Sequence, residues 1–399
     1  MTLPYFIEDL AGIGGTLKQR PEDFVVHEVP RYEPCGDGEH VMAEIEKTGL
    51  STIDMVDLLS RRLKVHRRDI GYAGLKDTAA VTRQWVTLRG TTPEAVVDVS
   101  GDKLKVLYVD RHRNKLRLGH LAGNRFTIKI RDVDPMKVVT LTLALRTLAR
   151  RGMPNYFGPQ RFGRRDLNDE LGLARLRGDQ AGVLRLLLGG PRETDDADEH
   201  AARSAYEAGD TKTALERWPR RGKDERDALR RLNDGKPVEA VASAIDSRVV
   251  DLWMSAVQSR LFNATVAARI KQLDEILDGE IAYKHNGGAV FRVESAVAER
   301  ERAERFEISP TGPLVGSKMM VPASVAGDVE KEVLAAAGVA SGLDAMPLPG
   351  SRRPLRVRPE ELHAESGIDE HGPYISLAFM LPAGSYATVL LREIMRNDA

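Results

Sequence analysis

The first part of the chain is predicted to consist of short strands with two helices among them. Residues 24–29 and 41–45 are β-rich runs separated by a Pro- and Gly-rich turn, and similar runs follow at 70–73, 85–88, 106–109 and 126–130. Ser51, with Asp54 three residues later, predicts a capped helix start. The apolar face of that helix would comprise Ile53, Val56, Leu59 and Leu63. With a second helix over 136–150, this part is predicted to be α+β with a mixed or antiparallel sheet.

Beyond residue 168 the pattern becomes mainly helical. Residues 168–186 and 200–272 are rich in Ala, Leu, Arg and Glu, whereas a strand at 374–381 and a helix at 387–395 return to the character of the first part. Insertions are tolerated at surface loops of a compact domain. We therefore predict a discontinuous domain of residues 1–177 and 351–399, interrupted by a helix-rich insertion domain of residues 178–350.

Composition predicts a soluble cytoplasmic protein. The 399 residues are 42% hydrophobic and 30% charged, which is typical of globular chains. We find no run of about 18 apolar residues that predicts a membrane helix, and the start of the chain lacks the pattern of a signal peptide. The single cysteine, Cys35, excludes an internal disulfide and a Cys-rich zinc site.

Charge is balanced overall, with 59 basic and 59 acidic residues, but it is unevenly distributed. Basic residues gather at 61–68, 111–131 and 146–165, whereas acidic residues gather around 193–199. Each basic run alone could be an ordinary solvated face. Three such runs together favour a surface that binds the phosphates of RNA or DNA.

Common nucleotide and metal motifs are absent. Gly312–Lys318 has the wrong spacing for a phosphate-binding loop, and no HExxH, histidine cluster or GxSxG motif occurs. The sequence therefore gives no support to a cofactor or to a metal.

The turn Gly71–Asp77 places a carboxylate directly after Lys76, between a glycine turn and a new strand. Such an aspartate can be a nucleophile, a base or a plain turn residue, and the last is the commonest. A second irregular segment, residues 155–163, combines three aromatics and two glycines with an Asn, a Gln and an Arg. These residue types suit an RNA base, because aromatics stack on bases and amides bind their edges. The alternative is a core-plugging turn in which Phe157 and Phe162 are buried.

Six blocks, in order along nearly the whole chain, resemble the TruD family of pseudouridine synthases. They are residues 73–84 around Asp77, which resemble the family's catalytic motif, and residues 21–28, 118–126, 155–163, 309–313 and 381–388. Thr78 departs from the family, in which a basic residue is common at this position, and we expect no catalytic consequence. The resemblance implies a pseudouridine synthase catalytic domain interrupted by a TruD insertion, acting without a cofactor on a tRNA uridine, typically position 13 of the D-arm. No protein partner and no membrane are implied.

The resemblance also implies roles for individual residues. Asp77 would be catalytic, attacking the sugar or the uracil ring of a flipped-out uridine. Phe157 would stack on the uracil and Asn155 would hydrogen-bond near it. Further candidates for substrate binding are Glu28, Lys76, Gln160, Arg161 and Arg392.

Several alternatives stay open at this point. Glu28 could instead be an exposed carboxylate at the end of a strand. Lys76 and Arg392 compete as the cation that pairs with Asp77. The protein as a whole could be a catalytically inactive RNA-binding protein of the same fold. A methyltransferase is disfavoured, because no glycine-rich cofactor loop follows the first strand.

Overall fold

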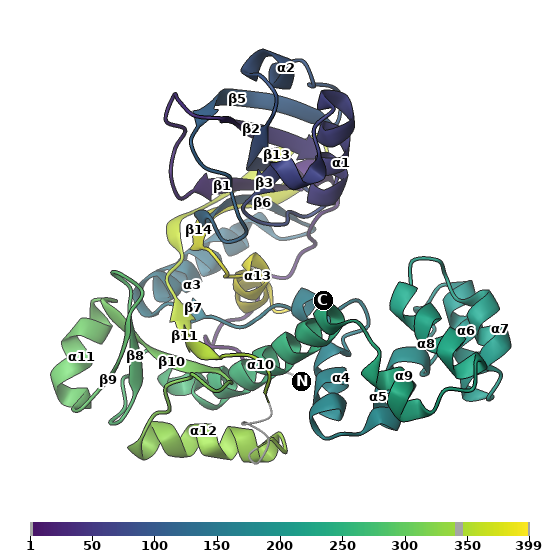
Figure 1. The fold of residues 1–399 in the computed structure, drawn as a ribbon. Helices are drawn as coiled ribbons and strands as arrows, with labels where there is room; N and C mark the ends of the chain where they lie inside the picture. The colour runs from purple at the N-terminus through teal and green to yellow at the C-terminus, as the bar shows by residue number, and fades with distance from the viewer. Residues whose placement is uncertain (1–2, 340–345, 398–399) are drawn as a thin grey trace. The chain divides into compact units, whose positions relative to one another are not determined.

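The computed structural model describes residues 3–339 and 346–397 (Figure 1). The chain forms two compact units. One, called here the sheet unit, comprises residues 5–155 and 356–399, and the other, the helical unit, comprises residues 1–4 and 156–355. The predicted catalytic domain (1–177 and 351–399) and insertion domain (178–350) remain predictions, since compactness does not assign roles. Their ranges also include residues 1–2, 340–345 and 398–399, which lie outside the described residues.

A mixed sheet organises the sheet unit. Its strand order is β13-β14-β6-β1-β4-β2-β5, and β3 pairs with β4. The strands are β1 (Phe24–Pro30), β2 (His40–Thr48), β3 (Ile70–Tyr72), β4 (Val81–Arg89), β5 (Leu104–His112), β6 (Leu121–Arg131), β13 (Glu360–Asp369) and β14 (Gly372–Pro382). β1 runs parallel to β4, while β6 and β14 are antiparallel neighbours. The predicted α+β class with a mixed sheet is confirmed.

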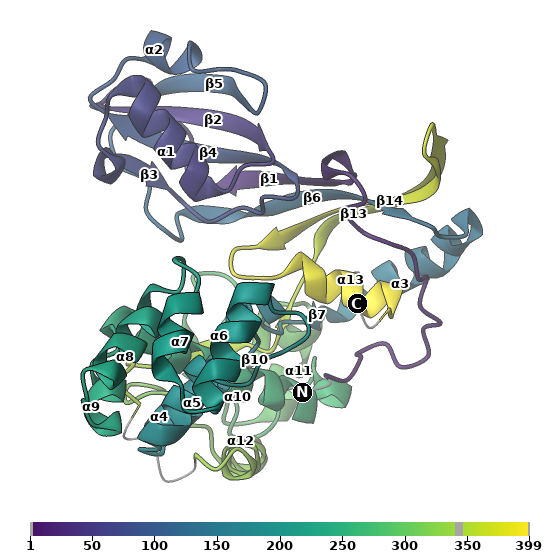
Figure 2. The ribbon, with the colours of Figure 1, turned by 90° about the vertical axis from the view of Figure 1, so that its right-hand side faces the viewer.

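Helix α1 (Thr52–Leu63) lies across one face of this sheet (Figure 2). Its start is the predicted capping box, since Ser51 and Asp54 bond each other's backbone amides. Its buried face was predicted partly wrongly: Met55, Val56 and Leu59 pack on β2 and β4, whereas Ile53 is 47% exposed. Helical spacing identifies a stripe, but the packing partner decides which edge of it is covered.

The remaining helices of the sheet unit are short or lie beside β13 and β14. They are η1 (Pro21–Asp23), η2 (Arg67–Asp69), α2 (Pro93–Val97), η3 (Pro135–Lys137), α3 (Val138–Arg151) and α13 (Ala387–Met395), the last with the bounds that the sequence predicts. The chain leaves this unit after β7 (Met153–Pro154) and returns at β12 (Arg356–Val357), and these two strands pair. An antiparallel strand pair therefore closes the unit where the other unit is inserted.

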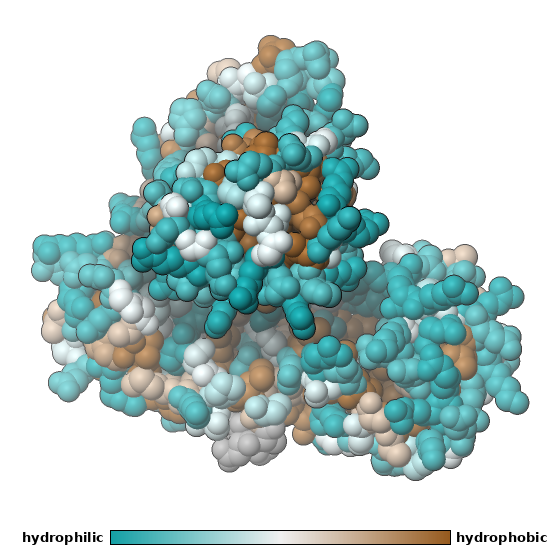
Figure 3. All heavy atoms as spheres, turned by 45° about the horizontal axis from the view of Figure 1, so that its top comes forward, coloured by the Kyte–Doolittle hydropathy of each residue, from teal (hydrophilic) through white to brown (hydrophobic). Residues whose placement is uncertain are grey.

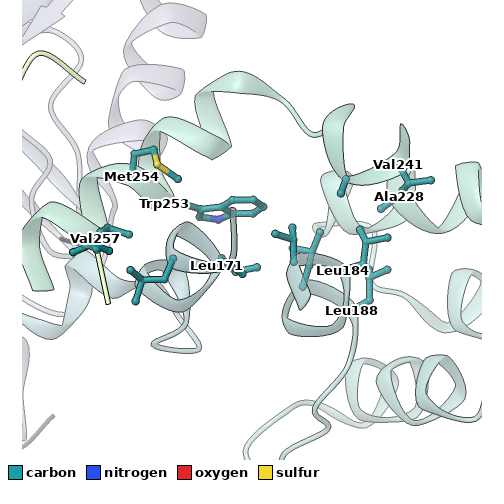
Figure 4. Close-up of a cluster of buried hydrophobic side chains, with 14 of the residues drawn as sticks. Leu171, Leu184, Leu188, Ala228, Val241, Trp253, Met254 and Val257 are labelled. Carbon is teal, nitrogen blue, oxygen red and sulfur yellow. The ribbon is translucent and has the colours of Figure 1, made fainter. Parts of the chain in front are cut away.

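The helical unit is built on a long apolar core. Its helices are η4 (Pro159–Phe162), α4 (Asn168–Leu176), α5 (Gln180–Leu188), α6 (Ala197–Glu207), α7 (Thr211–Arg217), α8 (Lys223–Asn233), α9 (Val238–Ser243), α10 (Ser247–Ala268), η5 (Ile270–Gln272), α11 (Ala296–Glu304) and α12 (Ser324–Ala336). A smaller sheet has the order β11-β10-β8-β9, formed by β8 (Ile281–Lys284), β9 (Val290–Arg292), β10 (Ile308–Leu314) and β11 (Ser351–Pro354). Figure 4 shows Trp253 of α10 beside Met254 and Leu171, with Leu184 and Leu188 of α5 in the same core.

The surface seen in Figure 3 is mainly hydrophilic, with smaller separate hydrophobic patches. Within residues 3–339 and 346–397, no helix is long and apolar enough to cross a membrane.

Candidate active site

The turn that carries Asp77 joins β3 to β4 in the sheet unit. The Asp77 side chain is 44% exposed, and its Oδ1 accepts a hydrogen bond of 3.3 Å from the backbone N–H of Ala79. A bond of this kind to the amide two residues later stabilises a turn. Asp77 is therefore a turn residue and also an accessible carboxylate. A structural role in the turn is thus compatible with a role as nucleophile or base.

The cation beside Asp77 is Lys18. Its ammonium donates to Oδ2 of Asp77 and also lies 4.5 Å from the centre of the Phe24 ring, within the range of a cation–π contact. Lys18 has φ = +56°, a region that residues other than glycine seldom adopt. Local sequence does not identify Lys18 as the partner of Asp77, because it lies 59 residues before Asp77 and no local spacing links them.

Asp77 is ionised at neutral pH. Burial acts to raise the pKa of its carboxyl, but the hydrogen bond and the charge of Lys18 act in the opposite direction, helped by the amides of Ala79 and Thr78. The net pKa lies below the ordinary value of an aspartate. An ionised, partly exposed carboxylate can act as a nucleophile or as a base.

Lys76 pairs with Glu28 and not with Asp77. Its Nζ lies 2.7 Å from Oε2 of Glu28, and the two side chains are 6% and 0% exposed. The same ammonium donates to Oδ1 of Asn124 at 2.6 Å, while Oε1 of Glu28 accepts from the backbone N–H of Trp85 at 3.3 Å. The alternative of an exposed strand-end carboxylate for Glu28 is wrong. The buried pair instead ties the turn to β1, β4 and β6.

Arg392, on α13, lies against the N-terminal segment. Its guanidinium is 4.0 Å from the centre of the Tyr5 ring, and its Nη1 is 3.8 Å from Oε1 of the neighbouring Glu393. The pairing of Arg392 with Asp77 remains a prediction.

Asn155 and Phe157 are both buried, at 3% and 8% exposure. Asn155 follows β7 in the sheet unit, whereas Phe157 belongs to the helical unit. The backbone N–H of Phe157 donates to Oδ1 of Asn263 at 2.8 Å, and Nδ2 of Asn263 donates back to the Phe157 carbonyl at 3.0 Å. This reciprocal pair fixes the backbone of Phe157 on α10.

The ring of Phe157 contacts a guanidinium and a second aromatic ring. The guanidinium of Arg353 lies 4.2 Å from its centre, and the Phe262 ring lies edge-on at 5.5 Å. Phe157 is therefore a core aromatic in this structure, whereas Phe162 is only partly buried. A base that stacked on the face under Arg353 would have to displace that guanidinium.

Gln160 and Arg161 lie on η4 in the helical unit and differ in accessibility. Gln160 is exposed. Arg161 donates from Nε to Oγ of Ser259 at 3.3 Å and from Nη2 to Oγ of Ser255. Arg161 thus holds η4 on α10, which supports the loop, while Gln160 stays accessible.

The basic runs are partly internal. Arg131 is 3% exposed and bonds Asp23 at 2.7 Å and Asp369 at 2.9 Å. Lys129 also pairs with Asp369, at 2.7 Å, and Arg125 pairs with Glu361 at 2.6 Å. The expectation of a phosphate-binding role is wrong for Arg131, whose charge is paired with Asp23 and Asp369 inside the sheet unit. Over the described ranges, no group of three or more His, Cys, Asp or Glu residues is placed to hold a metal ion.

Comparison with known proteins gives one family over the whole chain. The family model described as tRNA pseudouridine synthase D (TruD) matches residues 1–394. A relative named tRNA pseudouridine synthase D from Geobacter metallireducens is 43% identical over 398 residues, covering 98% of each chain. Another so named, from Anaeromyxobacter dehalogenans, is 35% identical over 406 residues, covering 100% of this chain and 97% of the relative.

A solved structure agrees with these matches. It is of a protein described as tRNA pseudouridine synthase D (TruD) from Methanosarcina mazei, with 27% identity and a TM-score of 0.83, and the match covers 99% of this chain and 96% of the other. With the family model matching from residue 1 to 394, the chain belongs to the TruD family of tRNA pseudouridine synthases.

Proposed function

We propose that this chain is an active enzyme that isomerises uridine to pseudouridine in tRNA, at position 13 of the D-arm. Membership of the family and the names of its relatives support tRNA as the substrate. The position rests on the resemblance of the sequence blocks. The observation that carries the proposal is the ionised carboxylate of Asp77, held on an accessible turn by Lys18.

The reaction breaks the bond between N1 of uracil and C1′ of ribose, rotates the base and forms a bond between C5 and C1′. The proton of C5 is lost and N1 gains one, so the product is an isomer of the substrate. No oxidant, reductant or co-substrate is consumed. A residue that stabilises the detached sugar or base is therefore the main chemical requirement.

Asp77 meets that requirement as a nucleophile. A carboxylate that forms a covalent adduct is an established way to break a glycosidic bond. Its low pKa keeps it in the reactive, charged form. Attack at C1′ of the ribose and attack at C6 of the uracil are both compatible with a carboxylate on a turn.

The base must leave the stack to reach Asp77, at a cost of a few kcal/mol. We assign Phe157 to stacking on the flipped uracil, which requires the guanidinium of Arg353 to move off its ring. We assign Asn155 to hydrogen bonding near the uracil and Gln160 to contact with the RNA. Arg161 supports the loop through Ser255 and Ser259. The buried pair of Lys76 and Glu28 anchors the turn that carries Asp77 to β1. Arg392 remains a candidate for binding the substrate.

At the level of domains, we propose that residues 1–177 and 351–399 form the catalytic domain, and that residues 178–350 form an insertion that binds RNA. The helical unit offers no metal cluster within its described residues, and Asp77 lies in the sheet unit. The proposed tRNA substrate supports a cytoplasmic location.

The test is to incubate the purified protein with an unmodified tRNA transcript and to map pseudouridine at single-nucleotide resolution. Pseudouridine at position 13 alone is expected, and it should be missing from the tRNA of cells without this protein. Pseudouridine at another position would overturn the proposed site. Tight tRNA binding without any pseudouridine would favour the inactive RNA-binding alternative.

A further inference from the structure

Lys47, on β2, is a buried lysine at the base of the catalytic turn. Lys47 is only 1% exposed. The ammonium donates to the backbone carbonyl of Leu50 at 2.6 Å and to the backbone carbonyl of Asp77 at 3.3 Å. Two backbone carbonyls are the partners of Lys47, so its ammonium joins the end of β2 to the turn.

A second contact from the same segment reaches the other side of the turn. Oγ1 of Thr52 accepts a hydrogen bond of 2.9 Å from the backbone N–H of Lys76. The hydroxyl of Thr52 in turn donates to Oε1 of Gln84 on β4 at 3.0 Å. Thr52 and Gln84 are 1% and 0% exposed, so these bonds are shielded from water and fix the geometry more firmly than surface bonds do.

Together the two contacts hold both ends of one dipeptide. The N–H of Lys76 is its first backbone group, and the carbonyl of Asp77 is its last. Residues 47–52 therefore hold the Lys76–Asp77 dipeptide at both ends, while the side chain of Asp77 stays free to reach Lys18.

We propose that Lys47 and Thr52 are positioning residues for the isomerisation, which hold the backbone on either side of Asp77 so that its carboxylate is presented in the attacking geometry. The inference rests on the proposed role of Asp77. A nucleophile must be held close to its reactive geometry, and a displacement of about 1 Å can cost about 100-fold in rate. Neither residue needs to touch the RNA.

The electrostatic setting of Lys47 agrees with a functional use. Burial lowers the pKa of its ammonium to about 8, opposed by the charges of Asp77 and Asp54, while the charge of Lys76 lowers it further. Burying an ammonium is costly unless it is hydrogen-bonded, and the carbonyls of Leu50 and Asp77 supply those bonds.

The test compares Lys47→Met with Lys137→Met in single-turnover reactions on a tRNA transcript. Lys137 is a matched control, because it also donates to a backbone carbonyl in the sheet unit, that of Ile13 at 3.0 Å. We expect Lys47→Met to lower the rate constant by about 10- to 100-fold. The affinity for tRNA should stay within about 2-fold of wild type, well below a tenfold change. Lys137→Met should change neither quantity.

Thermal unfolding of each variant separates positioning from loss of structure. An unchanged rate constant for folded Lys47→Met would overturn the inference, as would a loss of rate that matches only the loss of folded protein. Thr52→Val and Thr52→Ser give a second pair: the valine removes the hydroxyl and should slow the reaction, whereas the serine keeps it and should restore most of the rate. Equal rates for the two would overturn the role of Thr52.

Asp77→Asn in the same assay distinguishes failure of the proposed function from failure of the positioning role. Activity in that variant would refute the proposed function itself. An inactive Asp77→Asn beside a fully active Lys47→Met would leave the proposed function in place and refute the positioning role alone.

Discussion

Lys18 and Asp77 form an ion pair although 59 residues separate them in the chain. The pair joins the segment before β1 to the turn between β3 and β4. Because Lys18 lowers the pKa of Asp77 against the effect of burial, the pKa of the candidate nucleophile depends on a residue that no local motif marks.

Asp77→Asn should abolish pseudouridine formation, because an amide is a poor nucleophile and cannot act as a base. The binding of tRNA should stay within a few-fold, since the variant keeps the shape of the side chain. Pseudouridine mapping and a filter-binding assay measure the two effects. Asp37→Asn, which alters an exposed aspartate paired with Arg113, serves as the control and should remain active. Residual pseudouridine in Asp77→Asn would show that another residue is the nucleophile.

Lys18→Met should move the acid limb of the pH–rate profile to higher pH. Without the lysine, burial is left as the main influence, and burial raises the pKa of Asp77. The carboxylate is then protonated over more of the acid range, so activity is lost sooner as the pH falls. Single-turnover rates between about pH 4 and 7 measure this shift. Lys129→Met, which breaks the pair with Asp369, should leave the limb in place. An unshifted limb in Lys18→Met would remove Lys18 from the control of Asp77.

Lys76→Met should destabilise the protein by about 3–5 kcal/mol, because it leaves the carboxylate of Glu28 buried without its cation. The double variant Lys76→Met/Glu28→Gln should recover most of that loss, since no buried charge remains. Denaturant unfolding followed by circular dichroism gives both values. If the double variant is no more stable than the single one, the pair is not the source of the loss.

Phe157→Leu tests stacking apart from packing. Leucine keeps much of the apolar volume against Phe262 and Arg353 but has no aromatic face for a base. We expect a slower single-turnover rate with a modest loss of stability. Phe262→Leu, in the adjacent ring, is the matched control and should lose similar stability without the same loss of rate. Equal rates for the two variants would contradict stacking by Phe157.

The unfolding free energy of Lys47→Met minus that of wild type should be larger at neutral pH than at alkaline pH. The pKa of Lys47 falls from 10.5 to about 8 in the folded protein, so the unfolded chain binds more protons between these values. The unfolding free energy of wild type therefore rises with pH across that window, by about 3 kcal/mol at most. The methionine variant lacks this rise. Unfolding midpoints at about pH 7 and pH 10 for both proteins measure the difference, and parallel behaviour would show that Lys47 is not a depressed lysine.

Local patterns in the sequence determined much of the architecture. The capping box at Ser51, the bounds of α13 and the α+β class were predictable, because hydrophobic spacing and capping act over a few residues. The turn that carries Asp77 also follows from local sequence, since glycines and an aspartate favour that backbone.

Tertiary structure alone decided which charges meet. It placed Lys18 on Asp77, turned Lys76 toward Glu28 and buried Arg131 between Asp23 and Asp369. It also left Ile53 exposed on a helix whose apolar stripe includes it. Such pairings join segments that are distant in the chain, and burial affects their strength. The sequence thus determined where the candidate nucleophile stands, and the fold decided what keeps it charged and in place.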